Sequence, residues 1–242
     1  MNTEDKDRYE DRIHLEDVGR CPMIKGLTEY ESALTYLRGN NNASKDSENF
    51  TPHSTKPENI PFPNKQYQII YADPPWSFSS KELQTYDGKR FTSMDKHYPT
   101  QSKDWIKNLP VVSISQKDCA LFLWSTDAHL GEAIETMESW GFKYITVAFV
   151  WEKLTSTGKT VANLGAWTMK NYELCLFGTK GAMLKYKKSN NVYQKVAAER
   201  TKHSKKPEAV RKNIETLFGD LPRIELFARE QHEGWDVWGN EV

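Results

Sequence analysis

One tetrapeptide brings two hydrogen-bond acceptors and an aromatic ring together: Asp73-Pro74-Pro75-Trp76. Two consecutive prolines fix φ and restrict the residue before each of them, so the Pro74 carbonyl is held in one direction. The Asp73 carboxylate supplies the second acceptor. These parts suit an amine on a flipped-out nucleic-acid base, which donates to both acceptors while its ring stacks on the Trp76 face.

The amine of adenine is a poor nucleophile because its lone pair is delocalised into the ring. Two acceptors that draw on its hydrogens localise the lone pair toward an electrophile such as a methyl sulfonium. Positioning and charge stabilisation then matter more than a strong general base. The alternative interpretation of the tetrapeptide is a turn that ends a strand, since Asp and Pro are both favoured in turns.

The tetrapeptide directly follows a short apolar run, so a strand is expected to position it. Five such runs predict strands, at residues 66–72, 119–124, 144–151, 172–177 and 223–228. Helical spacing of apolar residues predicts helices at residues 127–140, with Gly141 as the C-cap, and at residues 207–218, with Pro207 in the first turn.

Strands that are apolar on both faces and alternate with helices indicate an α/β fold. We therefore expect a mostly parallel, doubly wound sheet with helices on both faces. Ligands of such sheets bind beyond the C-terminal ends of the strands, which is where the tetrapeptide would lie.

The chain divides by composition into two parts. Residues 1–60 are predicted to be a charged N-terminal arm, a short amphipathic helix within residues 23–38 and a polar linker. Residues 61–242 are predicted to form the catalytic domain.

The overall composition excludes several classes of protein. The formal net charge is zero, so any surface that attracts nucleic acid must be local. Cys119 and Cys175 lie in apolar runs and predict reduced core thiols, and no cluster of His and Cys predicts a metal site. The charged start and the lack of a long apolar stretch favour a soluble, cytoplasmic protein without a membrane partner.

Several ordered motifs together resemble the MT-A family of S-adenosylmethionine-dependent N6-adenine methyltransferases, named for a seventy-kilodalton subunit. The compact form resembles bacterial and phage members, whose implied substrate is DNA. The resemblance runs from residue 67 to residue 242 and is carried by IIYADPPW (69–76), HYPTQSKDWIKNLPV (97–111), ALFLWST (120–126), WGFKYITVAFVWEK (140–153), GAWTMKNYELCLFGTKG (165–181), HSKKPEAVRKNIE (203–215), RIELFARE (223–230) and GWDVWGNEV (234–242).

The resemblance implies a Rossmann-like class I methyltransferase fold with a permuted, β-class motif order, in which the catalytic tetrapeptide precedes the cofactor-binding segments. That order explains why the chain has no Gly-x-Gly-x-x-Gly fingerprint. The implied activity is site-specific methylation of the N6 amine of adenine in DNA, with S-adenosylmethionine as the cofactor.

The resemblance also implies roles for single residues. Asp73 would orient the amine and contact the methionine end of the cofactor, and Lys206 would face the cofactor carboxylate. The residues implied near the ribose and adenosine are Arg229, His232, Asn240 and Glu241. His232 stands in a loop that is shorter than in the messenger-RNA enzyme, and an ordinary loop residue is the alternative there. Tyr98 would line the base pocket.

A basic segment accompanies these residues. Residues 180–212 hold eleven Lys and Arg against two Glu. Such a run is usually a solvated face, but it adjoins Lys206, so Lys185, Lys187 and Lys188 are predicted to contact DNA phosphates close to the catalytic pocket.

Other functions stay open at this stage. The alternatives are an RNA adenine N6-methyltransferase, a catalytically inactive nucleic-acid-binding subunit and a cytosine N4-methyltransferase, although the tetrapeptide of the last usually begins with Ser. DNA is favoured over RNA. A homodimer is also expected, because residues 153–167 occupy the place of the family's interface loop.

Overall fold

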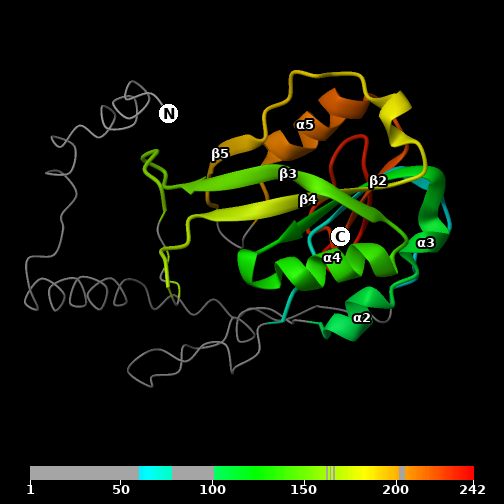
Figure 1. The fold of residues 1–242 in the computed structure, drawn as a ribbon, viewed down its shortest axis with the longest axis horizontal. Coiled ribbons are helices and arrows are strands. Elements are labelled where there is room, and N and C mark those ends of the chain that lie inside the picture. Colours follow the sequence, from blue (N-terminus) through cyan, green and yellow to red (C-terminus); the bar gives the residue numbers. More distant parts are fainter. Residues whose placement is uncertain (1–59, 78–100, 162, 164, 166, 202–204) are drawn as a thin grey trace, which may run out of the picture. The chain divides into compact units, whose positions relative to one another are not determined.

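The computed structural model describes residues 60–77, 101–161, 163, 165, 167–201 and 205–242. These residues form a seven-stranded sheet with the order β5-β3-β4-β2-β1-β6-β7 (Figure 1). The strands are β1 (Tyr67–Ala72), β2 (Ser115–Ser125), β3 (Lys143–Leu154), β4 (Tyr172–Lys180), β5 (Lys195–Glu199), β6 (Arg223–Leu226) and β7 (Asp236–Trp238).

The sheet is mostly parallel, as predicted. β1 pairs in parallel with β2 and β6, β6 with β7, and β3 with β5. Only β4, among the strands of the described residues, runs the other way, because it is antiparallel to both β2 and β3. The C-terminal ends of β1, β2 and β6 therefore lie at the same end of the sheet, together with the start of β4.

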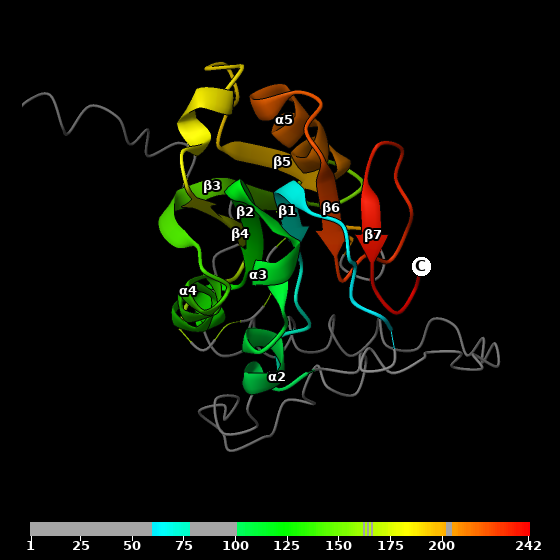
Figure 2. The same cartoon turned by 90° about the vertical axis from the view of Figure 1, so that its right-hand side faces the viewer.

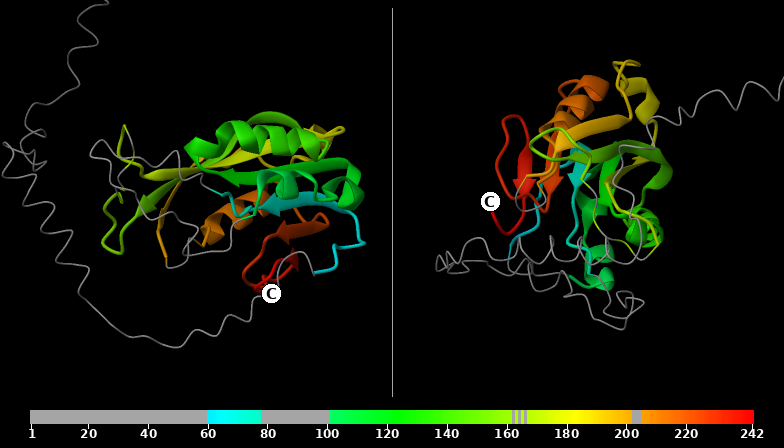
Figure 3. Two further views of the ribbon diagram at one scale, coloured as in Figure 1. Left: turned by 90° about the horizontal axis from the view of Figure 1, so that it is seen from below. Right: turned by 90° about the vertical axis from the view of Figure 1, so that its left-hand side faces the viewer.

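Helices cover both faces of the sheet (Figure 3). On one face, α4 (Leu130–Ser139) packs Ala133 and Met137 against the strands, next to α2 (Lys103–Lys107) and α3 (Val111–Ile114). On the other face, α5 (Glu208–Phe218) contributes Val210, Ile214 and Phe218 to a second core cluster. Figure 2 shows β1 between β2 and β6.

The strands and helices predicted within the described residues are all present, and the differences in their bounds have simple causes. β2, β3 and β4 extend beyond their apolar runs because their ends are paired but less buried. β5 and β7 were not predicted. β5 is the outermost strand and begins and ends with an exposed charged residue, and β7 has only three residues. The short helices α2 and α3 were also missed.

Several smaller expectations are confirmed. Gly141 has φ of 79°, the left-handed conformation that suits the residue after a helix. Pro207, which was expected in the first turn of α5, lies one residue earlier, as its N-cap. Cys119 and Cys175 are free and buried. The 3-10 turns η6 (Asp127–His129) and η7 (Met183–Tyr186) connect β2 to α4 and follow β4, respectively.

The predicted arm, amphipathic helix and linker, Cys21 and Tyr98 lie outside the described residues. No helix within the described ranges is both long and apolar enough to cross a membrane.

Candidate active site

The tetrapeptide directly follows β1, where the sheet's parallel strands end. Asp73 continues toward β6, with its backbone N–H 3.5 Å from the Leu226 carbonyl oxygen. The Trp76 N–H donates to the Pro74 carbonyl at 2.9 Å, which leaves that oxygen one further lone pair. The predicted pair of acceptors, the Asp73 carboxylate and the Pro74 carbonyl, is therefore present in one short loop.

Trp76 is not an open aromatic face, which corrects the prediction that its ring stacks on a base. The residue is 8% exposed and belongs to the core cluster on the α4 face. Its indole Nε1 donates to the Trp124 carbonyl at 2.9 Å, and its ring stacks on His129. Burial of a large aromatic ring contributes to the core, so Trp76 anchors the loop in the protein.

Lys206 lies next to Asp73, as the sequence suggests, but it binds two carboxylates at once. Its Nζ is 2.7 Å from Asp73 Oδ2 and 3.1 Å from Glu173 Oε2. Burial lowers the pKa of Lys206, yet the charges of Asp73 and Glu173 outweigh burial and raise its pKa above the usual value. The Lys206 side chain, which also faces the Trp124 ring at 5.4 Å, therefore stays a charged ammonium.

Glu173, near the start of β4, is a site residue that the sequence analysis missed. It is buried and also pairs with Lys153 of β3. Burial raises the pKa of Glu173, but the ammoniums of Lys206 and Lys153 lower it by more, so the net shift is downward. The half-buried Asp73 and the buried Glu173 thus alternate with Lys206 and Lys153 from the tetrapeptide to β3. The available signal was an acid inside the apolar run YELCLF, because buried carboxylates need partners.

Beside Asp73 lies a pocket of about 170 Å³. Five residues that the resemblance assigned to the cofactor line it: Asp73, Lys206, Arg229, His232 and Glu241. They come from distant parts of the chain. The remaining lining residues are Lys205, Arg211, Glu225, Phe227 and Glu230. Asn240 is half-buried and precedes Glu241, but is not among the residues that line the pocket.

Close backbone packing brings the C-terminal segment to this pocket. Gly239 lies against the backbone of Ala228, where an added Cβ would collide with the Ala228 carbonyl oxygen. The Ala228 N–H donates to the Trp238 carbonyl at 3.0 Å. Arg229, which follows Ala228, and Glu241, two residues after Gly239, are then neighbours, with Arg229 Nε 3.7 Å from Glu241 Oε1.

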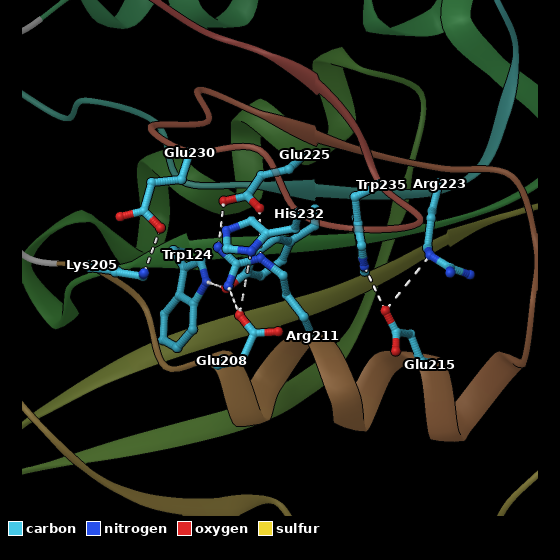
Figure 4. Close-up of polar contacts among 11 residues, drawn as sticks. Trp124, Lys205, Glu208, Arg211, Glu215, Arg223, Glu225, Glu230, His232 and Trp235 are labelled. Atoms are coloured by element: carbon cyan, nitrogen blue, oxygen red, sulfur yellow. Dashed lines mark hydrogen bonds and ion pairs between the residues drawn. The ribbon is translucent and has the colours of Figure 1, made fainter. Parts of the chain in front are cut away.

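A second charged network that sequence reasoning missed supports the wall of the pocket (Figure 4). Arg211 of α5 binds both oxygens of Glu225 on β6, at 2.7 and 3.2 Å, and Glu208 at 2.8 Å. Burial raises the pKa of Glu225 even though Arg211 opposes the shift. Burial lowers the pKa of Arg211, but Glu225 raises it by more. The position of Glu225 inside the apolar run RIELFA could have indicated a buried acid with a charged partner.

His232 lies beside this network, with its Nδ1 3.7 Å from Glu208 Oε2 (Figure 4). Its Nε2 is buried and has no hydrogen-bond partner among the described residues. A buried polar atom without a partner is costly, and an atom of this kind in a pocket wall suits a ligand hydroxyl. Together with the acceptor oxygens of Glu241, this atom fits the ribose of an adenosine-containing cofactor.

The three lysines predicted as phosphate contacts are not beside the pocket, and that location is wrong. Lys185 lies in η7 and pairs at 2.6 Å with Asp118 on β2. The Lys188 N–H donates to Leu217, at the C-terminal end of α5, whereas Lys206 precedes the start of α5. The eleven-residue helix separates the two places by about 16 Å. Because β4 is antiparallel to its neighbours, the chain leaves it at the end of the sheet opposite the pocket, and Lys185, Lys187 and Lys188 follow there.

The segment predicted as a dimer interface connects β3 to β4. It folds back on itself through a bridge between Leu154 and Thr160. Trp167, near its end, is 97% exposed. An indole so fully in contact with water is unusual for a monomeric surface, although single exposed apolar residues are common.

Known proteins match this chain over most of its described length. The MT-A70 family model matches residues 67–241. The Type II methyltransferase M.MunI of Mycoplasma sp is 39% identical over 193 residues, which are 74% of this chain and 79% of that protein.

Longer eukaryotic proteins match the same region. A probable N(6)-adenosine-methyltransferase MT-A70-like protein of Oryza sativa subsp. japonica is 29% identical over 73% of this chain. The N(6)-adenosine-methyltransferase catalytic subunit METTL3 of Homo sapiens is 27% identical over 73% of this chain. This chain covers 23% of the rice protein and 28% of the human protein.

Proposed function

Because the chain belongs to the MT-A70 family, we propose that it transfers a methyl group from S-adenosylmethionine to the N6 amine of adenine in DNA. It is a methyltransferase with the family's mixed α/β fold, and its family implies S-adenosylmethionine as the methyl donor. The catalytic domain corresponds in this proposal to residues 61–242.

One observation carries the proposal. Asp73 belongs both to the loop that presents two acceptors and to the wall of the pocket lined by Lys206, Arg229 and Glu241. The amine and the methyl donor would therefore meet at one carboxylate. The tetrapeptide comes first along the chain and the other lining residues follow, which supports the permuted motif order.

The chain's own residues prepare the amine. Asp73 Oδ2 is held by Lys206, so Oδ1 is the oxygen that remains for an N–H of the base. The buried Pro74 offers its carbonyl to the other N–H. Acceptors fixed before the substrate arrives cost no reorganisation during the reaction, and this makes them effective.

The cofactor supplies an electrophilic methyl group on a positively charged sulfur. Glu241 and His232 would hold the ribose, and Arg229 would orient Glu241. Lys206, which already binds two carboxylates, would present its remaining N–H to the cofactor carboxylate. Asn240, next to Glu241, stays a proposed contact to the adenosine.

DNA is favoured over RNA because M.MunI, a Type II methyltransferase, is matched at higher identity and over most of its length. The N(6)-adenosine-methyltransferases named above support RNA as the second candidate. An inactive subunit is disfavoured, since Asp73 and the residues of the pocket are in place.

The test is tritiated methyl transfer to unmethylated genomic DNA and to RNA transcribed from it, followed by mass spectrometry of the nucleosides. N6-methyldeoxyadenosine in the DNA is the expected product. The Asp73→Asn variant should lose roughly a hundredfold to a thousandfold in rate, as when one such stabilising group is removed. Asp236→Asn, at an acid outside the pocket that binds Lys65 at 2.7 Å, is the matched control and should stay active.

Each other outcome selects a different function. Label found only in RNA would favour the RNA enzyme, and N4-methylcytosine would contradict adenine as the substrate. An Asp73→Asn variant with parental turnover would refute the proposed role of the carboxylate.

We also propose a homodimer that pairs through residues 153–167, with the exposed Trp167 at the interface. Light scattering at micromolar concentration should give twice the monomer mass, and Trp167→Ala should lower it. A parent protein that remains monomeric at this concentration contradicts the homodimer.

A further inference from the structure

His129 is a buried histidine that the proposed mechanism does not use. It is the last residue of η6, ahead of α4, and only 2% of it is exposed. Its ring stacks on that of Trp76, with the centroids 5.9 Å apart and the planes 16° from parallel. His129 therefore lies directly against the last residue of the tetrapeptide.

Both ring nitrogens of His129 have defined neighbours. Nδ1 is 2.8 Å from Thr126 Oγ1, and Nε2 is 3.2 Å from the Ser77 carbonyl oxygen. A carbonyl oxygen only accepts, so Nε2 carries the proton, and Nδ1 accepts from the Thr126 hydroxyl. This assignment fixes the tautomer and the orientation of the ring.

Two of the contacts of His129 fall on consecutive residues of the loop, Trp76 and Ser77. Trp76 in turn donates its backbone N–H to the Pro74 carbonyl at 2.9 Å. The indole of Trp76 is tied separately to the Trp124 carbonyl. The part of the loop that follows the prolines is thus held from one side by β2 and from the other by η6.

We propose that His129 is a positioning residue for the methyl-transfer reaction, because it holds Trp76 and Ser77 and through them the direction of the Pro74 carbonyl. This inference rests on the proposed function, since it names what fixes one of the two amine acceptors. It assigns no chemical step to His129, which is not among the residues that line the pocket.

The kinetic test compares three substitutions. His129→Phe keeps a ring against Trp76 but loses both hydrogen bonds, His129→Gln keeps a donor for Ser77 but loses the ring, and His129→Leu loses both. We expect His129→Leu to lower kcat at least tenfold, with KM for S-adenosylmethionine within twofold of the parent. A displacement of about 1 Å at reacting groups costs on the order of a hundredfold in rate. The Phe and Gln variants should each recover part of this loss.

A matched control separates positioning from a general effect on the helix. Thr136 is 1% exposed on α4, and its hydroxyl donates to the Glu132 carbonyl within the same helix. Thr136→Val disturbs a buried polar group on the element that follows His129 without touching the loop, so kcat should not change. A folded His129→Leu enzyme with parental kcat would overturn the proposal, as would an equal loss of kcat in Thr136→Val.

A second measurement does not depend on activity. In protein labelled with 5-fluorotryptophan, the fluorine resonance of Trp76 is assigned with Trp76→Phe. His129→Leu should shift or broaden this resonance and leave that of Trp235, which packs in the other core cluster, unchanged. An unmoved Trp76 resonance contradicts the proposal. If the parent protein methylates neither DNA nor RNA, the proposed function fails, and the fluorine spectrum still tests the contact between His129 and Trp76.

Discussion

The substitution Glu173→Gln tests the buried charges next to the carboxylate of Asp73. Glu173 binds Lys206 at 3.1 Å and also pairs with Lys153, and its side chain is 11% exposed. Glutamine has nearly the same size but no charge, so it keeps an oxygen acceptor and removes the attraction to both ammoniums. The expected result is a large loss of stability and a weaker hold on Lys206.

The size of the stability loss depends on which partners Lys206 and Lys153 keep after the substitution. Removing one partner of a buried ion pair costs roughly 3–5 kcal/mol of unfolding free energy, because the other charge stays buried. Lys206 keeps Asp73 at 2.7 Å, whereas Lys153 keeps the Trp151 ring, whose centroid is 5.1 Å from its Nζ. We therefore expect the lower end, about 3 kcal/mol. In a domain of this size, that corresponds to a fall in melting temperature of roughly 6–12 °C.

Reversible urea unfolding measures this loss, with methyl transfer followed in parallel. Glu152→Gln is the matched control, because Glu152 is on the neighbouring strand and pairs at 2.6 Å with the exposed Lys195. Its loss should be much smaller, since exposed ion pairs contribute little. A loss below about 1 kcal/mol for Glu173→Gln would refute the argument that these charges are buried and interdependent.

Three further predictions follow from the same geometry. Since the folded pKa of Glu173 is lowered, its stabilisation is complete above its unfolded pKa of about 4.3 and is lost as pH falls through the folded value. The unfolding free energies of parent and Glu173→Gln should therefore approach each other as pH falls below about 4.3. Glu241→Ala should weaken cofactor binding in calorimetry by at least tenfold, because it removes the proposed acceptor for the ribose hydroxyls together with the ion pair to Arg229. Unchanged affinity would remove Glu241 from the ribose site. Lys187→Ala with Lys188→Ala should lower the salt slope of DNA binding by about 0.9 per lost phosphate contact while kcat stays constant, and a parental slope would mean a solvated face.

The sequence predicted the sheet and the position of the tetrapeptide well because both depend on local patterns. Apolar runs identified the central strands. Because Asp73 directly follows one of these strands, it was expected where the parallel strands end. The resemblance then brought Lys206, Arg229 and Glu241 to the same place, and the pocket contains all three.

Long-range direction was harder to predict. The basic segment was expected beside the pocket because it is close to Lys206 in sequence. The reversed direction of β4 and the length of α5 instead place Lys185 and Lys188 at the end of the sheet opposite the pocket. Closeness in sequence is a poor guide to closeness in space in a sheet, because each strand takes the chain from one end of the sheet to the other.

The two missed carboxylates show how α5 completes the site. Glu173 and Glu225 lie in apolar strands, and each binds a cation from the start of α5: Lys206 just before the helix, and Arg211 in its first turns. A buried acid cannot stay charged at low cost without such a partner. The acids on the sheet and the cations of α5 therefore require each other. Docking of α5 brings Lys206 to Asp73 and forms the pocket wall in one step, so cofactor binding and the packing of this helix should stabilise each other.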